Sequence, residues 1–209
     1  MTPASSHLTA SGHPPAIALF SLVVIVLLAG DLLSKSLSFS RVAGEPVVVE
    51  RGADAATIIP YHDPIVLVPG VLSLRLTLNQ GAVFGIGQGG RWVFVFFSIV
   101  AVLFVLGIFL RSSACAVSLH VMLACLLSGA LGNLYDRVIF GSVRDQFLLF
   151  PESSLPFGWT WPGGNSGLYP WIFNLADVCL VVGIVLLLVL AWKKEDLPRG
   201  HEAHPPEHP

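Results

Sequence analysis

The sequence predicts an all-α membrane protein, a four-transmembrane-helix bundle that carries a small β-rich segment on the membrane surface. Of its 209 residues, 54% are hydrophobic and only 11% are charged, whereas about a quarter of the residues in a typical soluble domain are charged. Four apolar stretches reach the roughly 20 residues that a helix needs to cross the hydrocarbon core. They are residues 16–37, 92–110, 114–135 and 172–192.

Four spans place both chain termini on one side of the membrane and both long connections on the other. Arginines occur on both sides, but the Lys193–Lys194 pair directly follows the last span. Because basic residues next to a span are retained in the cytoplasm, this pair favours cytoplasmic termini and an extracytoplasmic β-rich segment. A formal net charge of −2 gives no indication of a nucleic-acid partner.

The β-rich segment is expected at about residues 45–80, between the first two spans. In "VLSLRLTLN", leucines alternate with polar residues, which predicts a half-buried strand; the leucines are Leu72, Leu74, Leu76 and Leu78. Such a strand suits a small sheet packed on the membrane surface. The polar, Pro- and His-containing ends of the chain, residues 1–15 and 193–209, are expected to be disordered tails around a membrane domain at 16–192.

The end of the third span is expected to approach another helix closely. Gly129 and Gly132 lie near the end of the third span, where small residues allow two helix backbones to approach. A loop rich in Pro, Gly and aromatic residues, at about 148–171, then leads into the fourth span. Its aromatic side chains suit the membrane interface, and we expect it to act as a lid.

The polar residues of the spans gather at one face of the membrane. Each alone has a structural explanation: Asp31 and Lys35 can form an i,i+4 ion pair, Asn174 can cap a helix, and Asp177 can favour the helix dipole. Their convergence at one end of a bundle instead indicates a site. The gathered residues are Asp31, Lys35, Asn79, Asn133, Asp136, Arg137, Asn174 and Asp177, with Asp145 in the adjoining loop.

The reactive groups available at this face are carboxylates. The sequence lacks GxSxG and HExxH motifs, and its three cysteines have no disulfide or metal spacing. Two carboxylates that share a site cannot both ionise easily, so one keeps a proton while the other acts as a base. This pair can activate water without metal or cofactor. Spacing alone leaves open which two of the four aspartates, Asp31, Asp136, Asp145 and Asp177, meet.

Five motifs together resemble the bacterial lipoprotein signal peptidase family, the type II signal peptidases. They are "DLLSK" at 31–35, "NQGAVFG" at 79–85, "GNLYDRV" at 132–138, "GSVRDQF" at 141–147 and "FNLADV" at 173–178. The resemblance implies a four-span aspartyl protease of the bacterial cytoplasmic (inner) membrane, with cytoplasmic termini and its site at the outer face. Such an enzyme removes the signal peptide from diacylglyceryl-modified prolipoproteins, cutting before the lipidated cysteine.

The same resemblance implies roles for particular residues. Asp145 and Asp177 are the expected catalytic pair, and the residues expected to line or brace the site are Asp31, Lys35, Asn79, Gly81, Asn133, Asp136, Arg137, Asn174 and Ala176. Residues 45–80 would form a surface β-cradle. Prolipoproteins and membrane lipids are the expected partners, globomycin the expected inhibitor, and a monomer the expected state. No cofactor or metal is implied.

Two features depart from the family pattern. Asp145 is flanked by Arg144 and Gln146 where hydrophobic residues are usual, and the loop that follows contains the added stretch "WTWPGGNSG". We interpret Arg144 as a solvated loop arginine. The alternative functions are a small proton-coupled membrane transporter and a non-catalytic membrane subunit. Midplane acids, broken helices or an inverted repeat would indicate a transporter, whereas here the acids lie at one face.

Overall fold

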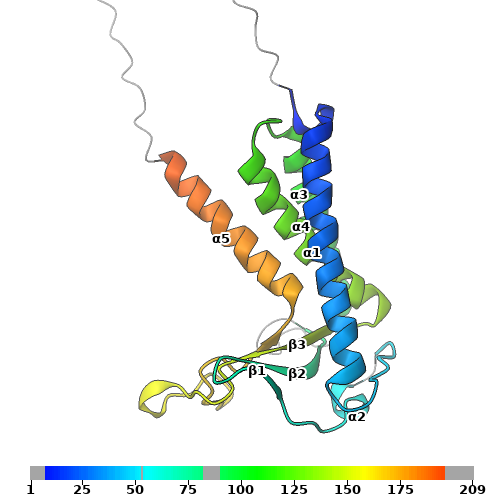
Figure 1. Cartoon of the computed structure of the whole chain (residues 1–209), viewed down its shortest axis with the longest axis vertical. Helices are drawn as coiled ribbons and strands as arrows, with labels where there is room; N and C mark the ends of the chain where they lie inside the picture. The colour runs from blue at the N-terminus through cyan, green and yellow to red at the C-terminus, as the bar shows by residue number, and fades with distance from the viewer. Residues whose placement is uncertain (1–7, 53, 82–89, 196–209) are drawn as a thin grey trace, which may run out of the picture.

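The computed structural model describes residues 8–52, 54–81 and 90–195, and it contains the four expected helices and a small antiparallel sheet (Figure 1). All four helices are long and apolar enough to cross a membrane, so the expected fold class is confirmed. They are α1 (Pro14–Arg41), α3 (Arg91–Arg111), α4 (Val117–Ile139) and α5 (Leu175–Glu195). The largest departures from the expected bounds are at the ends of α1 and α4, which continue four residues beyond residues 37 and 135.

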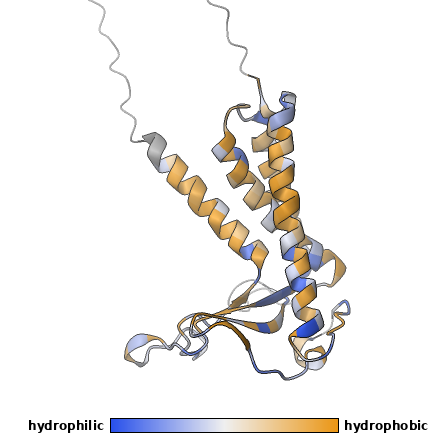
Figure 2. Cartoon of the chain, in the orientation of Figure 1, coloured by the Kyte–Doolittle hydropathy of each residue, from blue (hydrophilic) through white to orange (hydrophobic). Residues whose placement is uncertain are grey.

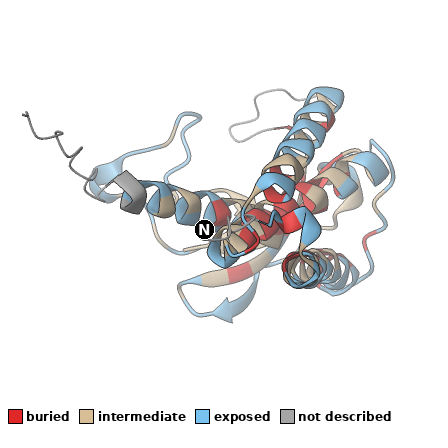
Figure 3. Ribbon diagram, turned by 90° about the horizontal axis from the view of Figure 1, so that it is seen from above, coloured by how far each residue is buried: buried red, intermediate tan, exposed pale blue. Residues whose placement is uncertain are grey.

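Helix α4 is the centre of the bundle. It packs against α1, α3 and α5, and half of its most apolar window is buried, against 17–22% for the other three helices. Viewed from above, the buried residues gather where the helices meet, and the outer faces are exposed (Figure 3). These exposed faces are apolar (Figure 2), as expected of helices that contact lipid. Helix α5 leans away from the bundle with distance from the sheet (Figure 1).

Glycines allow the expected close approach of helices, and the structure shows that α4 approaches α5. A Cβ atom added to Gly129 would lie 2.5 Å from the carbonyl oxygen of Ala176, and one added to Gly183 would lie 2.7 Å from a methyl carbon of Leu126. At Gly132 the space is occupied by the carboxylate of Asp31. The absence of side chains at these positions therefore sets how closely the start of α5 approaches α4 and α1.

The sheet has the strand order β1-β2-β3-β4, with every neighbouring pair antiparallel. Strands β1 (Ile65–Val68) and β2 (Leu72–Asn79) lie in the expected segment, which also contains the short helix α2 (Ala55–Ile58). The other two strands were not expected. They are β3 (Val143–Leu149) and β4 (Ile172–Phe173), on either side of the loop before α5.

The alternation in β2 holds only in part. Leu76 and Leu78 are buried in a cluster with Phe39 of α1, and Leu74 packs at its edge. Ser73, on the expected polar face, is nevertheless 1% exposed, and the register with β3 shifts between Leu74 and Thr77. A bulge of this kind interrupts the strict two-residue period. The cluster fixes the sheet against the end of α1.

The expectation of a disordered segment at residues 1–15 is wrong for its described part. Ala10 is fully buried, its N–H donates to the carbonyl oxygen of Ser112 (2.9 Å), and residues Ala10–Gly12 form a short 3-10 helix. The ring of His13 accepts the N–H of Ala16 (3.2 Å) and caps α1. Residues 1–7 and 196–209, also expected to be tails, lie outside the described residues.

The loop between β3 and β4 is a hairpin that projects sideways from the sheet (Figure 1). A bridge between Ser154 and Gly167 holds its two arms together, and a 3-10 helix, Pro156–Gly158, lies near its tip. The expected range of 148–171 overlaps β3, which continues to Leu149. A lid function for this hairpin stays a prediction.

The contact between α4 and α5 gives a first testable prediction. Gly129→Ala should lower the apparent Tm in detergent, because the added methyl group meets backbone atoms and overpacking of this kind costs about 1–3 kcal/mol. The matched control is Gly107→Ala in α3, where nothing lies within 4 Å of the added atom. The control should leave the Tm unchanged or raise it. Equal losses in both variants would contradict the close helix contact.

Candidate active site

The polar residues of the membrane helices meet at the end of the bundle that carries the sheet. Hydrophilic residues of α1 and α5 lie at this end in Figure 2. Here α5 begins, α4 ends and β3 crosses beneath them. Of the residues expected at the site, Asp31, Lys35, Asn133, Asp136, Asp145, Asn174, Ala176 and Asp177 are linked to one another by side-chain contacts.

The start of α5 is a reciprocal cap. Asn174 precedes the first helical residue, and its side-chain oxygen accepts the N–H of Asp177 (3.0 Å). In return, Oδ2 of Asp177 accepts the N–H of Asn174 (3.1 Å). Two backbone donors that a helix leaves unpaired are thereby satisfied. The structural explanation for both residues is therefore correct, but it uses only one oxygen of Asp177.

The second oxygen of Asp177 belongs to a network of side-chain amides. Asn133 of α4 donates from Nδ2 to Oδ1 of Asp177 (2.8 Å). Asn174 donates from its own Nδ2 to Oδ1 of Asp145 (2.6 Å) and to Oδ1 of Asn133 (3.1 Å). Asn174 thus contacts Asp145 through its amide and Asp177 through its backbone. The two carboxyl groups lie on either side of this one residue.

Burial and the neighbouring carboxylate raise the pKa of Asp145 to about 8. Its side chain is 1% exposed, so loss of hydration is the larger cause, and the charge of Asp177 is the next. Hydrogen bonds from Asn174 and Asn79 and the charge of Lys35 lower this pKa in part. Asp145 therefore carries a proton at neutral pH.

A buried cluster of four charged side chains lies next to this pair. Nζ of Lys35 is 2.7 Å from Asp31 and 3.3 Å from Asp136. Arg144 donates to Oδ1 of Asp136 from Nη2 (2.9 Å) and Nε (3.2 Å), and its backbone N–H donates to Oδ2 (3.0 Å). None of the four residues is more than 6% exposed. Two carboxylates and two cations balance, as burial of charge requires.

This ion cluster, Asp31, Lys35, Asp136 and Arg144, also holds the start of α5. Oδ1 of Asp31 accepts the N–H of Ala176 (2.9 Å), another donor that the helix would otherwise leave unpaired. Lys35 donates to Oδ1 of Asn133 (3.3 Å), the residue that binds Asp177. The cluster therefore connects α1, α4 and β3 to the first turn of α5.

The interpretation of Arg144 as a solvated loop arginine is wrong. It is buried and paired with Asp136, not solvated. Gln146, two residues further along β3, is fully buried and donates to the hydroxyl of Ser34 in α1 (3.1 Å). Because side chains alternate along a strand, both point away from the face that carries Asp145. An arginine inside a largely apolar segment, with Asp136 as a carboxylate available to pair, was the signal that could have revealed this.

The remaining expected residues lie at the border of the network. Asn79 ends β2, accepts the N–H of Gly81 (3.1 Å), and contacts Asp145 through its side chain. Arg137 does not pair with its neighbour Asp136; its guanidinium lies 5.3 Å from the ring centre of Phe94. Residues 82–85 of the "NQGAVFG" motif lie outside the described residues.

Tyr169 is an addition that the sequence motifs did not indicate. Burial raises the pKa of this phenol, and the charges of Asp177 and Asp145 raise it further, which locates the ring near the carboxyl pair. The ring packs edge-to-face against Trp171 and Phe173, at 5.2 and 6.1 Å between centres. The hairpin thus reaches the site through an aromatic residue.

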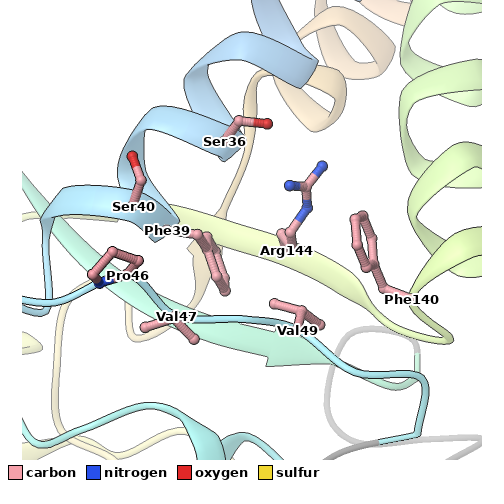
Figure 4. Close-up of a pocket in the computed structure, with 8 residues that line it drawn as sticks. All are labelled: Ser36, Phe39, Ser40, Pro46, Val47, Val49, Phe140 and Arg144. Carbon is pink, nitrogen blue, oxygen red and sulfur yellow. The ribbon is translucent and has the colours of Figure 1, made fainter.

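A separate pocket of about 200 Å³ lies beside Arg144 (Figure 4). Its lining is mostly apolar and comes from the end of α1, the chain before α2, the end of α4 and β3. It consists of Ser36, Phe39, Ser40, Pro46, Val47, Val49, Phe140 and Arg144. Because Arg144 and Asp145 point to opposite faces of β3, this pocket does not open onto the carboxyl pair.

Among the described residues, no three His, Cys, Asp or Glu side chains are arranged to hold a metal ion.

Solved structures share this fold. A bacterial membrane enzyme determined at 2.3 Å resolution superposes with a TM-score of 0.66 over 90% of this chain and 96% of its own, at 23% identity. A second, determined at 1.9 Å resolution, gives a TM-score of 0.61 over 85% of this chain and 94% of its own.

Sequence comparisons extend the likeness to function. The lipoprotein signal peptidase of Symbiobacterium thermophilum is 37% identical over 66% of this chain and 84% of its own length. That of Streptococcus pyogenes serotype M1 is 30% identical over 85% of this chain and 95% of its own. Residues 23–193 match the family described as signal peptidase (SPase) II. The chain is therefore a member of the signal peptidase II family of membrane proteases, the lipoprotein signal peptidases.

Proposed function

We propose that this protein is an aspartyl endopeptidase whose catalytic pair is Asp145 and Asp177. Its substrates are diacylglyceryl-modified prolipoproteins, and it cuts the bond before the lipidated cysteine. The single observation that carries the proposal is the position of Asn174, which hydrogen-bonds to both carboxyl groups. Asp31 and Asp136, the other two acids at this end, are each in contact with a cation.

The surroundings of the two carboxyl groups suggest different roles. Asp145, with its pKa raised to about 8, holds a proton and serves as the acid. Asp177 accepts N–H bonds at both oxygens and lies in the first turn of α5, where the helix dipole favours negative charge. Asp177 therefore serves as the base.

The reaction proceeds through a gem-diol. Asp177 takes a proton from a water molecule while the water oxygen bonds to the scissile carbonyl carbon, and Asp145 gives its proton to the carbonyl oxygen. Asp177 then passes its proton to the amide nitrogen as the C–N bond breaks. Asp145 recovers a proton from one hydroxyl of the gem-diol, so both groups return to their starting states. This sequence requires neither metal nor cofactor.

The substrate reaches this pair from the membrane. The pair lies at the end of four apolar helices, so a peptide bond next to a diacylglyceryl group can reach it while the acyl chains stay in lipid. Asn79 and Arg137, at the border of the network, are suited to hold peptide carbonyls or lipid oxygens.

In this proposal the protein is a monomer of the bacterial inner membrane, with its termini in the cytoplasm and its site at the outer face. Globomycin inhibits it.

Substitution of the pair tests the proposal. Asp145→Asn and Asp177→Asn should each reduce cleavage of a diacylglyceryl-modified prolipoprotein by about 10²–10⁴-fold, the usual contribution of a positioned acid or base. Loss of the signal peptide is followed on a gel, with the unmodified precursor as a negative control. The matched control is Glu45→Gln, which changes an exposed carboxylate that is distant in sequence from both aspartates. This variant should retain full activity.

Two results would contradict this assignment. If folded Asp145→Asn still cleaves while Asp31→Asn does not, another carboxyl pair activates the water. If the folded wild type leaves the lipidated precursor intact, the chain is not a protease of this substrate, and a proton-coupled transporter becomes the stronger candidate.

The raised pKa of Asp145 also predicts a pH dependence of stability. An unfolded aspartate has a pKa of about 3.9, so between about pH 4 and pH 8 the folded protein binds more protons at this residue than the unfolded chain. Stability is then fully present below about pH 4 and is lost as the pH rises to about 8. Asparagine does not titrate. The Tm of Asp145→Asn minus that of the wild type should therefore increase from pH 4 to pH 8 and level off above.

The control for this measurement is Glu45→Gln, which removes an exposed carboxylate outside the network. A difference between Asp145→Asn and the wild type that stays constant with pH would mean that Asp145 is ionised at neutral pH. Wild-type cleavage should also decline above about pH 8, where the acid loses its proton.

A further inference from the structure

We propose that the hairpin between β3 and β4 is inserted, at its tip, into the lipid surface on the sheet side of the bundle. This hairpin, residues 150–171, extends sideways from the sheet rather than over the site (Figure 1). Phe157 is 89% exposed and Trp159 is 65% exposed. The inference goes beyond the proposed reaction and holds whether or not the carboxyl pair is catalytic.

The exposed aromatic tip is one part of a larger apolar surface. The turn between β1 and β2 lies next to the base of the hairpin, because the N–H of Phe150 donates to the carbonyl oxygen of Val71 (2.8 Å). Every residue of β1 is exposed, by 43–54%, although all four are Ile, Val or Leu. We call these residues together the apolar shelf: Ile65, Val66, Leu67, Val68, Val71, Phe157 and Trp159.

Hydrogen bonds between the two arms of the hairpin hold its tip in a defined conformation. Two pairs of residues bond across the arms, Leu155 N–H to Ser166 O (2.7 Å) and Leu168 N–H to Ser153 O (2.8 Å). The indole N–H of Trp161 donates to Gly167 O (2.9 Å). Phe157 adopts a left-handed conformation with φ of 61°, which is uncommon for a bulky residue. The exposed ring of Phe157 is therefore carried on a hydrogen-bonded turn.

The composition of the shelf selects lipid as that surface. Residues 64–74 carry no charge, and Glu152 is the sole charged residue from 147 to 173. Large exposed apolar surfaces mark contacts with membranes or proteins, and Trp is enriched where a membrane meets water. Trp92, at the start of α3, is 69% exposed at the same end of the bundle. An uncharged apolar shelf with exposed aromatic side chains, on a chain with four helices able to cross a membrane, fits the headgroup region of the bilayer.

Insertion would fix the depth of the carboxyl pair. The hairpin leaves β3 four residues after Asp145 and returns through β4 to Asp177. Its two arms therefore begin next to the two aspartates in the sequence. Anchoring the tip in lipid would hold both groups at a constant distance from the bilayer surface.

Fluorescence quenching tests the insertion directly. The full-length wild type and Trp159→Phe are reconstituted in vesicles containing a phospholipid brominated near the headgroup end of its acyl chains. The difference between the two spectra gives the emission of Trp159, which should be quenched by the brominated lipid and protected from aqueous iodide. Trp192→Phe provides the positive control. Trp192 is 72% exposed and lies near the end of α5 that points away from the sheet, within a helix able to cross a membrane.

Two results would overturn the proposal. Quenching of Trp159 by iodide but not by brominated lipid would place the tip in water. Resistance to both quenchers at every protein-to-lipid ratio would show that protein covers the tip.

Discussion

The pairing of Asp31 and Asp136 with Lys35 and Arg144 is the interaction on which the rest of this end of the bundle depends. Removing a charged group from water is costly unless it is paired and hydrogen-bonded, and breaking one partner of a buried pair costs about 3–5 kcal/mol. Here the four groups lie between α1, α4 and β3, and each carboxylate also accepts a backbone N–H. Because one of these N–H groups belongs to Ala176, the position of α5 depends on a charge pair in α1.

The same balance separates structural from reactive acids. Asp31 and Asp136 each have a cation within 3.3 Å, whereas Asp145 and Asp177 are in no salt bridge with any described residue and are instead held by the amides of Asn133 and Asn174. An amide donor satisfies a carboxyl oxygen without neutralising its charge. Two adjacent carboxyl groups without a paired cation favour a shared proton. Asp145 carries this proton because its side chain is more deeply buried than that of Asp177.

Local sequence patterns predicted the elements that local physics determines. The four spans follow from apolar length, and β2 follows from its alternating leucines. Strand β3 was missed because "VRDQFLL" does not alternate, and its pairing with β2 joins residues about seventy positions apart. Spacing could not separate the four aspartates either, because a paired and an unpaired carboxylate look alike in sequence; the choice of Asp145 and Asp177 came from the family motifs. Arg144 was interpreted as solvated because its partner, Asp136, lies across the turn between α4 and β3.

Infrared difference spectroscopy tests the shared proton most directly. The carbonyl stretch of a protonated carboxyl group is recorded for the wild type, Asp145→Asn and Asp31→Asn, in lipid, at neutral pH and above pH 8. The predicted result is a protonated carboxyl band in the wild type that disappears as the pH rises through about 8, is absent from Asp145→Asn, and persists in Asp31→Asn. A band that survives Asp145→Asn and vanishes in Asp31→Asn would place the proton in the ion cluster. That result would contradict both its charge balance and the proposed acid.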